Sequence, residues 1–246
     1  MGYFSVLWSL LKTNLFATVW FNFRVLPFRQ AIHFPFFIYG RFLLRSFDGS
    51  VIIDCDRLWP GMIKIGKRDW YVATSIARTI WTINGNLVFY GSARFMHGSY
   101  LLVARGGRLE MGTRALFGTD VHFCCFDQIT LGNDVRMAWD VQIMDTSFHY
   151  IEKVDSGEVS SLTKPIIIGN NVWVGNRVTI SKGAVLPDYT IVASNSLCNK
   201  DYSESGGSIL IAGCPARIKM TGVRRIFDKT IEKQYDKVYS YDRTHL

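Results

Sequence analysis

The sequence predicts an all-β solenoid, because apolar residues recur with a period of six and small or β-branched residues follow most of them four places later. The apolar positions are Ile168, Val174, Ile180, Leu186, Val192 and Cys198, and the small ones are Val172, Val178, Ala184, Thr190 and Ser196. Looser hexads begin at Ile83, Met111 and Leu131, with slips between the sets. A β-sandwich would show a period of two, so the period of six favours the solenoid.

Each hexad is interpreted as one short strand and one turn. The apolar residue points into a narrow core in which only a small second side chain fits. Three hexads close one triangular coil, and stacked coils bury a continuous core that no single repeat could bury. The predicted solenoid domain covers residues 49–217.

Residues 1–48 form a basic, aromatic-rich segment that cannot span a membrane, because polar residues interrupt it before ~20 apolar residues accumulate. A helical spacing of apolar side chains is seen at Phe4, Leu7, Trp8, Leu11 and Leu15. It predicts an amphipathic helix that lies on a membrane surface, or that packs on the domain or on a neighbouring subunit. Five Lys or Arg and no acidic residue precede Asp48, a balance suited to anionic lipids or a lipid-linked substrate.

Composition excludes several classes of protein. The net charge is +8, yet no basic cluster with interleaved aromatic residues suggests a nucleic-acid partner. The five cysteines have no C-x-x-C spacing, so we expect reduced core residues, and no secretory signal is recognisable. The expected location is the cytoplasm, with peripheral contact to the inner face of the cytoplasmic membrane as an extension. No P-loop, dinucleotide fingerprint or nucleophile elbow is present.

Two blocks carry a family resemblance. Residues 164–175 read K-P-I-I-I-G-N-N-V-W-V-G and residues 212–217 read A-G-C-P-A-R. They resemble the left-handed parallel β-helix acyltransferases of the hexapeptide-repeat class, in particular the maltose and galactoside O-acetyltransferases and their polysaccharide-modifying relatives. The resemblance is strong over 109–217, weak over 54–108 and absent before. It implies a left-handed parallel β-helix, an acetyl-CoA donor, a sugar hydroxyl as acceptor, and a homotrimer.

The repeat is interrupted after Ile143 by a polar loop, residues 150–163, and a histidine precedes this loop. Loops on rigid scaffolds commonly carry function. His149 stands where the resembling enzymes have their essential histidine, so the resemblance implies a general base that takes the acceptor's proton. Asp145 is the nearest candidate to orient the imidazole, although an aspartate here could equally be a turn former.

The resemblance also suggests acceptor and cofactor residues. Asp120 lies closest to the family's acceptor-side asparagine, and Glu152, Glu158 or neither could supply an acidic partner from the loop. Coenzyme A is expected along the later coils, with a backbone N–H as the oxyanion donor. The expected cofactor-binding residues are Gly175 and Ala193 beside the pantetheine, and Trp173, Lys200 and Arg217 near the adenine or phosphates. Gly175 and Ala193 are also what tight corners require.

Two alternatives to an acetyltransferase stay open at this stage. One is a zinc hydratase resembling the gamma-class carbonic anhydrases, with three histidines converging across a subunit interface; His97, His122 and His149 are the candidates, but no metal-ligand spacing is present and no metal is expected. The other is a non-catalytic, membrane-attached trimeric scaffold.

The carboxyl-terminal extension, residues 218–246, alternates apolar and charged residues. Ile226, Ile231, Tyr235 and Val238 predict a short helix that caps the solenoid or grips a neighbour. The expected acceptor is a precursor of lipopolysaccharide, capsule or exopolysaccharide, while a free sugar, an amino sugar or an antibiotic, and an acyl group other than acetyl, stay open.

Overall fold

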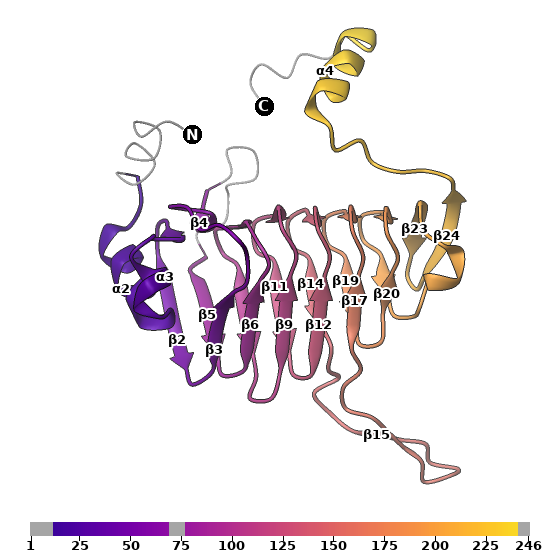
Figure 1. The fold of residues 1–246 in the computed structure, drawn as a ribbon. Coiled ribbons are helices and arrows are strands. Elements are labelled where there is room, and N and C mark those ends of the chain that lie inside the picture. The colour runs from indigo at the N-terminus through magenta and orange to yellow at the C-terminus, as the bar shows by residue number, and fades with distance from the viewer. Residues whose placement is uncertain (1–11, 69–76, 241–246) are drawn as a thin grey trace.

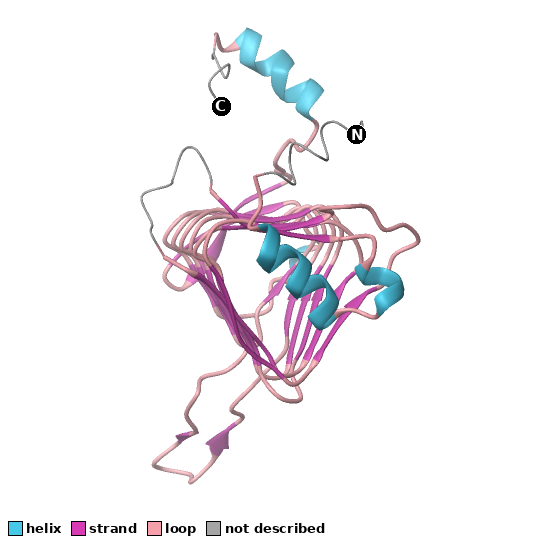
Figure 2. Ribbon diagram, turned by 90° about the vertical axis from the view of Figure 1, so that its left-hand side faces the viewer, coloured by secondary structure: helices cyan, strands magenta, loops and turns pink. Residues whose placement is uncertain are grey.

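The computed structural model describes residues 12–68 and 77–240, which form a three-sided prism of stacked coils (Figures 1 and 2). Each coil contributes one strand to each face, and the strands within a face are parallel up to the last pair. The first face contains β1 (Phe36–Ile38), β4 (Ile63–Lys67), β7 (Ala93–Met96), β10 (Ala115–Phe117), β13 (Arg136–Met137), β18 (Trp173–Val174), β21 (Ile191–Val192), β23 (Ile209–Gly213) and the antiparallel β24 (Ala216–Thr221). The second face contains β2 (Phe42–Phe47), β5 (Thr79–Ile83), β8 (Tyr100–Val103), β11 (His122–Cys125), β14 (Gln142–Met144), β19 (Thr179–Ser181) and β22 (Leu197–Cys198). The third face contains β3 (Ser50–Ile53), β6 (Asn86–Phe89), β9 (Arg108–Met111), β12 (Gln128–Leu131), β17 (Ile166–Ile168) and β20 (Val185–Leu186).

The six-residue register is confirmed as the core of the prism. All six apolar positions from Ile168 to Cys198 are at most 1% exposed, and the small positions that follow them are buried as well. In the earlier coils the same inward places hold aromatic rings, for example Trp81, Phe95 and Phe117. Phe95 contacts Trp81 and Phe117 with ring centroids 4.9 and 4.7 Å apart, so one stack of side chains runs from coil to coil.

The prism begins earlier than the sequence indicated. The expected boundary at residue 49 is wrong, because β1 and β2 already pair in register with β4 and β5. At the other end, β24 continues to Thr221, four residues past the expected limit. The first coil has no hexad signal of its own, since its strands carry runs of apolar residues where later coils alternate.

The end of the prism is covered by α2 (Leu15–Val25) and α3 (Phe28–Ala31), as Figure 2 shows. Thr18 and Asn22 are fully buried and bind the backbone of β1, the edge strand of the first face. The Asn22 amide donates to the Phe36 carbonyl at 2.8 Å and accepts from its N–H at 3.1 Å. An uncovered strand edge would pair with other chains. The helix therefore protects this edge, and the polar residues that interrupt the apolar segment are the ones that do so.

The described helix Leu15–Val25 begins at the last position of the predicted amphipathic helix, whose other positions, Phe4, Leu7, Trp8 and Leu11, lie outside the described residues. None of the described helices is long and apolar enough to cross a bilayer.

Two segments leave the prism. The interrupted corner forms a protruding hairpin of β15 (Ile151–Glu152) and β16 (Val159–Ser160), seen below the prism in Figure 1. After the short helix η1 (Ser203–Ser205) and β24, the chain continues to α4 (Lys229–Val238). The predicted terminal helix is present, yet none of its residues is buried, and in Figure 1 it stands apart from the prism.

Candidate functional site

His149 follows β14 at the base of the hairpin, where the second face turns toward the third. It is exposed, and its backbone carbonyl accepts a hydrogen bond from the Ser147 hydroxyl at 2.9 Å. The residue before it, Phe148, adopts a left-handed φ of 59° and packs its ring 5.3 Å from Phe126 of the preceding coil. The histidine is therefore carried by a turn that is fixed on both sides.

The hairpin base is fastened by a lysine that sequence reasoning missed. The Lys182 ammonium donates to the Ser147 hydroxyl at 2.9 Å and to the carbonyls of Ser161 and Leu162, so it binds both arms of the loop. The Ser147 N–H also donates to the Leu162 carbonyl at 3.0 Å. Because Lys182 lies in the next coil, its role depends on a contact between coils that the local sequence does not reveal.

Within the described residues, the Asp145 carboxylate makes its hydrogen bonds with the preceding coil and none with His149. The Asp145 side chain is fully buried, and its two carboxylate oxygens accept the N–H groups of Phe126 and Asp127, each at 2.8 Å. Burial raises the pKa of Asp145, against the opposing effect of these backbone N–H groups and of the Cys125 thiol. These bonds tie the corner after β14 to the corner of the coil before it, which is a structural task.

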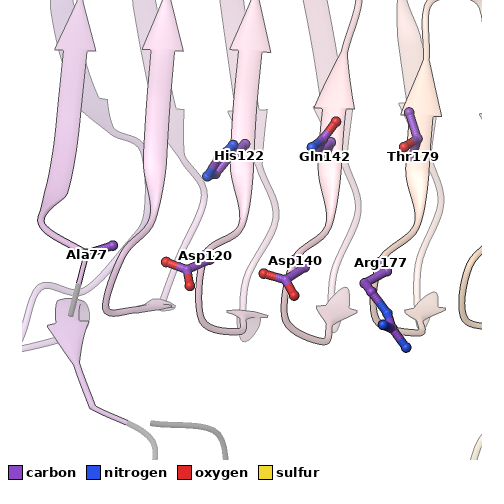
Figure 3. A pocket seen from close by; sticks show the side chains of 7 residues that line it. All are labelled: Ala77, Asp120, His122, Asp140, Gln142, Arg177 and Thr179. Carbon is purple, nitrogen blue, oxygen red and sulfur yellow. The ribbon is translucent and has the colours of Figure 1, made fainter. Parts of the chain in front are cut away.

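A polar cavity of about 540 Å³ lies at the opposite edge of the second face, where the first face turns into it (Figure 3). Its lining is Ala77, Asp120, His122, Asp140, Gln142, Arg177 and Thr179. Asp120, Asp140 and Arg177 occupy equivalent corners of successive coils, each with a left-handed φ of 54–57°. His122, Gln142 and Thr179 are register partners on β11, β14 and β19. Carboxylates, an amide, a hydroxyl and a guanidinium on adjacent coils can hydrogen-bond several hydroxyls of one ligand.

The structure thus brings the predicted Asp120 together with residues that sequence reasoning left out. Asp140, Gln142 and Arg177 could have been found by aligning whole coils, because they repeat the positions of Asp120 and His122 one and two coils later. The Asp120 carboxylate lies against Gly98, in space that a Cβ at that position would occupy.

The expected cofactor residues lie on the last coils but not at one point. Trp173 projects from the first face, 38% exposed, with the Arg225 guanidinium 5.3 Å from its ring. Gly175 lies at the following corner, where a Cβ would come 2.7 Å from the Ser194 nitrogen, so packing between coils alone requires glycine there.

Three further expected cofactor residues are placed as follows. Ala193 follows β21, and its N–H donates to the Ile211 carbonyl at 2.9 Å. Lys200 lies past β22, at a different corner from Ala193, with its ammonium 5.1 Å from the Tyr202 ring. Arg217 is exposed on β24. Trp173, Gly175 and Ala193 therefore share one region of the prism, and Lys200 is separate.

No protein-family profile matches the chain. The chain is 33% identical over 110 residues to the galactoside O-acetyltransferase of Escherichia coli K12, covering 44% of this chain and 48% of the relative. It is 41% identical over 56 residues to the polysialic acid O-acetyltransferase of Neisseria meningitidis, covering 23% and 26%. The crystal structure of the polySia specific acetyltransferase NeuO superposes with a TM-score of 0.51 at 21% identity, covering 80% of this chain and 98% of that one.

The chain is thus similar in sequence to O-acetyltransferases of the hexapeptide-repeat family. It spans about half the length of the galactoside relative, and the NeuO superposition establishes the left-handed parallel β-helix. The solenoid predicted from the hexads and the handedness implied by the resemblance are therefore confirmed.

The three histidines of the zinc alternative lie at separate places in this chain. His97 is buried near the Thr119 hydroxyl, His122 lines the cavity, and His149 stands at the hairpin base. Within the described part of a single chain, no three side chains of the types that ligate metals gather. Since that alternative places its ligands across a subunit interface, metal analysis of the purified protein is the measurement that decides it.

Proposed function

We propose that this chain transfers an acetyl group from acetyl-CoA to a sugar hydroxyl of a cell-surface polysaccharide precursor. The observation that carries the proposal is that one chain has both a cavity lined by polar side chains that can bind hydroxyl groups and an interrupted coil that presents one histidine. Relatives named galactoside, polysialic acid and lipopolysaccharide-biosynthesis O-acetyltransferases support the class of acceptor, and a structural neighbour crystallised with acetyl coenzyme A is in keeping with the donor.

In the proposed reaction, the His149 imidazole takes the proton of the acceptor hydroxyl as its oxygen attacks the thioester carbonyl. The tetrahedral intermediate carries a negative oxygen, which a backbone N–H of the prism stabilises. When the C–S bond breaks, the thiolate of coenzyme A takes the proton from the imidazolium. The products are the acetyl ester and free coenzyme A, with no covalent enzyme intermediate.

We infer that the working site joins two chains of a homotrimer. The cavity residues stand at the start of β11, β14 and β19, whereas His149 follows the end of β14, so one whole face separates them. A general base must come within ~3 Å of the proton that it removes. The hairpin projects away from its own prism in Figure 1, a direction that suits contact with a neighbour. Trp173 and Gly175 would then border the donor, and Asp120 the acceptor.

The test is release of coenzyme A with a panel of nucleotide-sugars and lipid-linked glycans. His149→Ala should lower kcat by roughly 10²–10⁴-fold with unchanged folding, because the side chain is exposed. His122→Asn, in the cavity, should chiefly raise KM for the acceptor. Full activity of His149→Ala would exclude His149 as the base, and inactivity of the wild-type protein with every acceptor would favour the scaffold alternative.

The assembly is tested by mixing inactive variants. His149→Ala and Asp120→Ala impair different halves of the proposed site, so refolding the two chains together should regain activity in mixed trimers. Activity that stays at the level of the separate variants, with mixed trimers shown by mass, would contradict a shared site.

A further inference from the structure

The outer face of α2 and α3 is apolar and exposed. Its residues, here called the cap face, are Leu15, Phe16, Val19, Trp20, Phe23, Phe28 and Ile32, which are 40–80% exposed. Phe16 is the most exposed, and the Phe23 ring lies 6.0 Å from the Phe28 ring, so the two helices share one surface. Single exposed apolar residues are ordinary, but seven of them on two adjacent helices mark an interaction site.

The helix α2 has apolar residues on both sides. Its inner side, with Phe21 and Val25, packs on the prism, while Arg24 is the only charged residue in the whole helix. A surface helix normally turns a polar side to water. Because the inner side already satisfies the core and the edge of β1, the composition of the outer side is not explained by folding.

The charge of the residues around the cap face indicates which kind of partner this face binds. Residues 12–47 contain five Lys or Arg and no acidic residue, and Arg24, Arg29, Arg41 and Arg45 are exposed. Arg29 is exposed on α3, next to Phe28 in the sequence, and the Arg24 guanidinium stacks 5.0 Å from the Phe47 ring. Aromatic side chains with flanking cations fit the boundary between lipid head groups and acyl chains of an anionic bilayer. A protein partner with an apolar surface would not by itself require this excess of cations.

We propose that the cap face docks on an anionic membrane and inserts Phe16, Trp20 and Phe23 below the head groups. The helices cover one end of the prism (Figure 2), so this docking leaves the three faces and the hairpin clear of the bilayer. The inference deepens the proposed function, because it puts the cavity beside acceptors assembled on a lipid. Membrane binding itself can be measured without any acceptor.

The experiment is co-sedimentation of the full chain with phosphatidylcholine vesicles, with and without about one third phosphatidylglycerol. We expect binding to the anionic vesicles only, weakened by added salt. The double variant Phe16→Asp/Trp20→Asp should lower the partition coefficient at least tenfold. Arg29→Gln/Arg41→Gln should lower it by about tenfold or more, since one cation near the surface contributes roughly fivefold. A matched control, Ile231→Asp/Val238→Asp on the exposed helix α4, should bind like wild type.

Substitutions are used because deletion of the residues before Asp48 would remove β1 and β2 and open the core. Circular dichroism and acetyl transfer to a soluble acceptor show that each variant folds, so failure of docking and failure of catalysis are distinguishable. Equal binding to both kinds of vesicle, or anionic binding that survives Phe16→Asp/Trp20→Asp, would overturn the proposal. It would also be overturned if vesicles are not bound and the double variant lowers the oligomer mass, which makes a second copy the partner. Binding only after removal of residues 1–11 would make that segment the occupant.

Discussion

The buried carboxylate of Asp145 gives a sharp test of how the corner that carries His149 is built. The isosteric change Asp145→Asn keeps the size of the side chain and replaces one of its two acceptor oxygens by an NH2 group. In the wild-type protein each oxygen accepts one backbone N–H, from Phe126 or Asp127, at 2.8 Å. The variant can satisfy only one of the two.

The expected loss of stability follows from the one backbone N–H that is left without an acceptor. A buried N–H without an acceptor costs about 1–3 kcal/mol, and water cannot replace the oxygen because Asp145 is fully buried. For a chain of this length, 1 kcal/mol corresponds to roughly 2–4 °C in Tm, so a loss of about 4–8 °C is expected for ~2 kcal/mol. Burial raises the pKa of Asp145 in the folded state, so stability from this group is present at low pH and falls as pH rises through the folded pKa. The difference in stability between the wild-type protein and Asp145→Asn should therefore decrease from acidic to neutral pH.

Thermal unfolding by circular dichroism measures this difference in stability. The pH profile of kcat/KM separately tests the role of His149. If Asp145 holds the corner, the variant unfolds earlier while the acidic limb of the profile stays in place. If Asp145 instead orients the His149 imidazole, the variant should keep its Tm. Its kcat should fall, and the acidic limb of its pH profile should shift. That second pattern would refute the structural role derived from the two backbone bonds.

Three further predictions concern residues around the site. Lys182→Met should raise protease cleavage of the hairpin and lower kcat roughly tenfold to a hundredfold through misplacement of His149; an unchanged kcat would show that the base of the loop holds without it. Arg177→Asn should stabilise the protein by about 0.5–1 kcal/mol, because asparagine tolerates the left-handed region, and should raise KM for the acceptor; an unchanged KM would remove Arg177 from acceptor binding. In a thiol titration at mildly alkaline pH, Cys214 should react first because it is exposed, whereas burial raises the pKa of Cys124 to about 11; fast labelling that persists in Cys214→Ser would contradict this.

The sequence predicted the later coils well because each repeat there meets the same requirement, an aliphatic side chain and a small one in a narrow core. It predicted the first coil poorly, since β1 and β2 pack under a helix and need no hexad. From the sequence, Asn22 is an interruption of an apolar segment, and Thr18 carries no signal. Their function as acceptors and donors for the edge of β1 appears only when the helix is placed against the strand.

The site was predicted in part for a similar reason. The hairpin and His149 interrupt a regular pattern and are visible locally. The pairing of Asp145 with two N–H groups of the preceding coil, and the contact of Lys182 with the hairpin, join residues 18–35 positions apart. Such contacts arise only when the coils stack. An analysis of one coil at a time therefore pairs Asp145 with His149, the candidate partner nearest in sequence.

The residues at the corners of the coils meet two different requirements, one from the geometry of the turn and one from the proposed binding of the acceptor. Several corners place a non-glycine residue at positive φ, which costs least for aspartate and asparagine. Asp120 and Asp140 meet that requirement cheaply, and Arg114 offsets its cost through a bidentate ion pair with Asp134. Arg177 has no ion pair within the described ranges and lines the cavity instead. Asparagine would close this turn at lower cost, so we expect the guanidinium to serve the acceptor in the proposed function. Acceptor specificity is therefore expected to change with the corner residues, while the inward strand residues determine the fold.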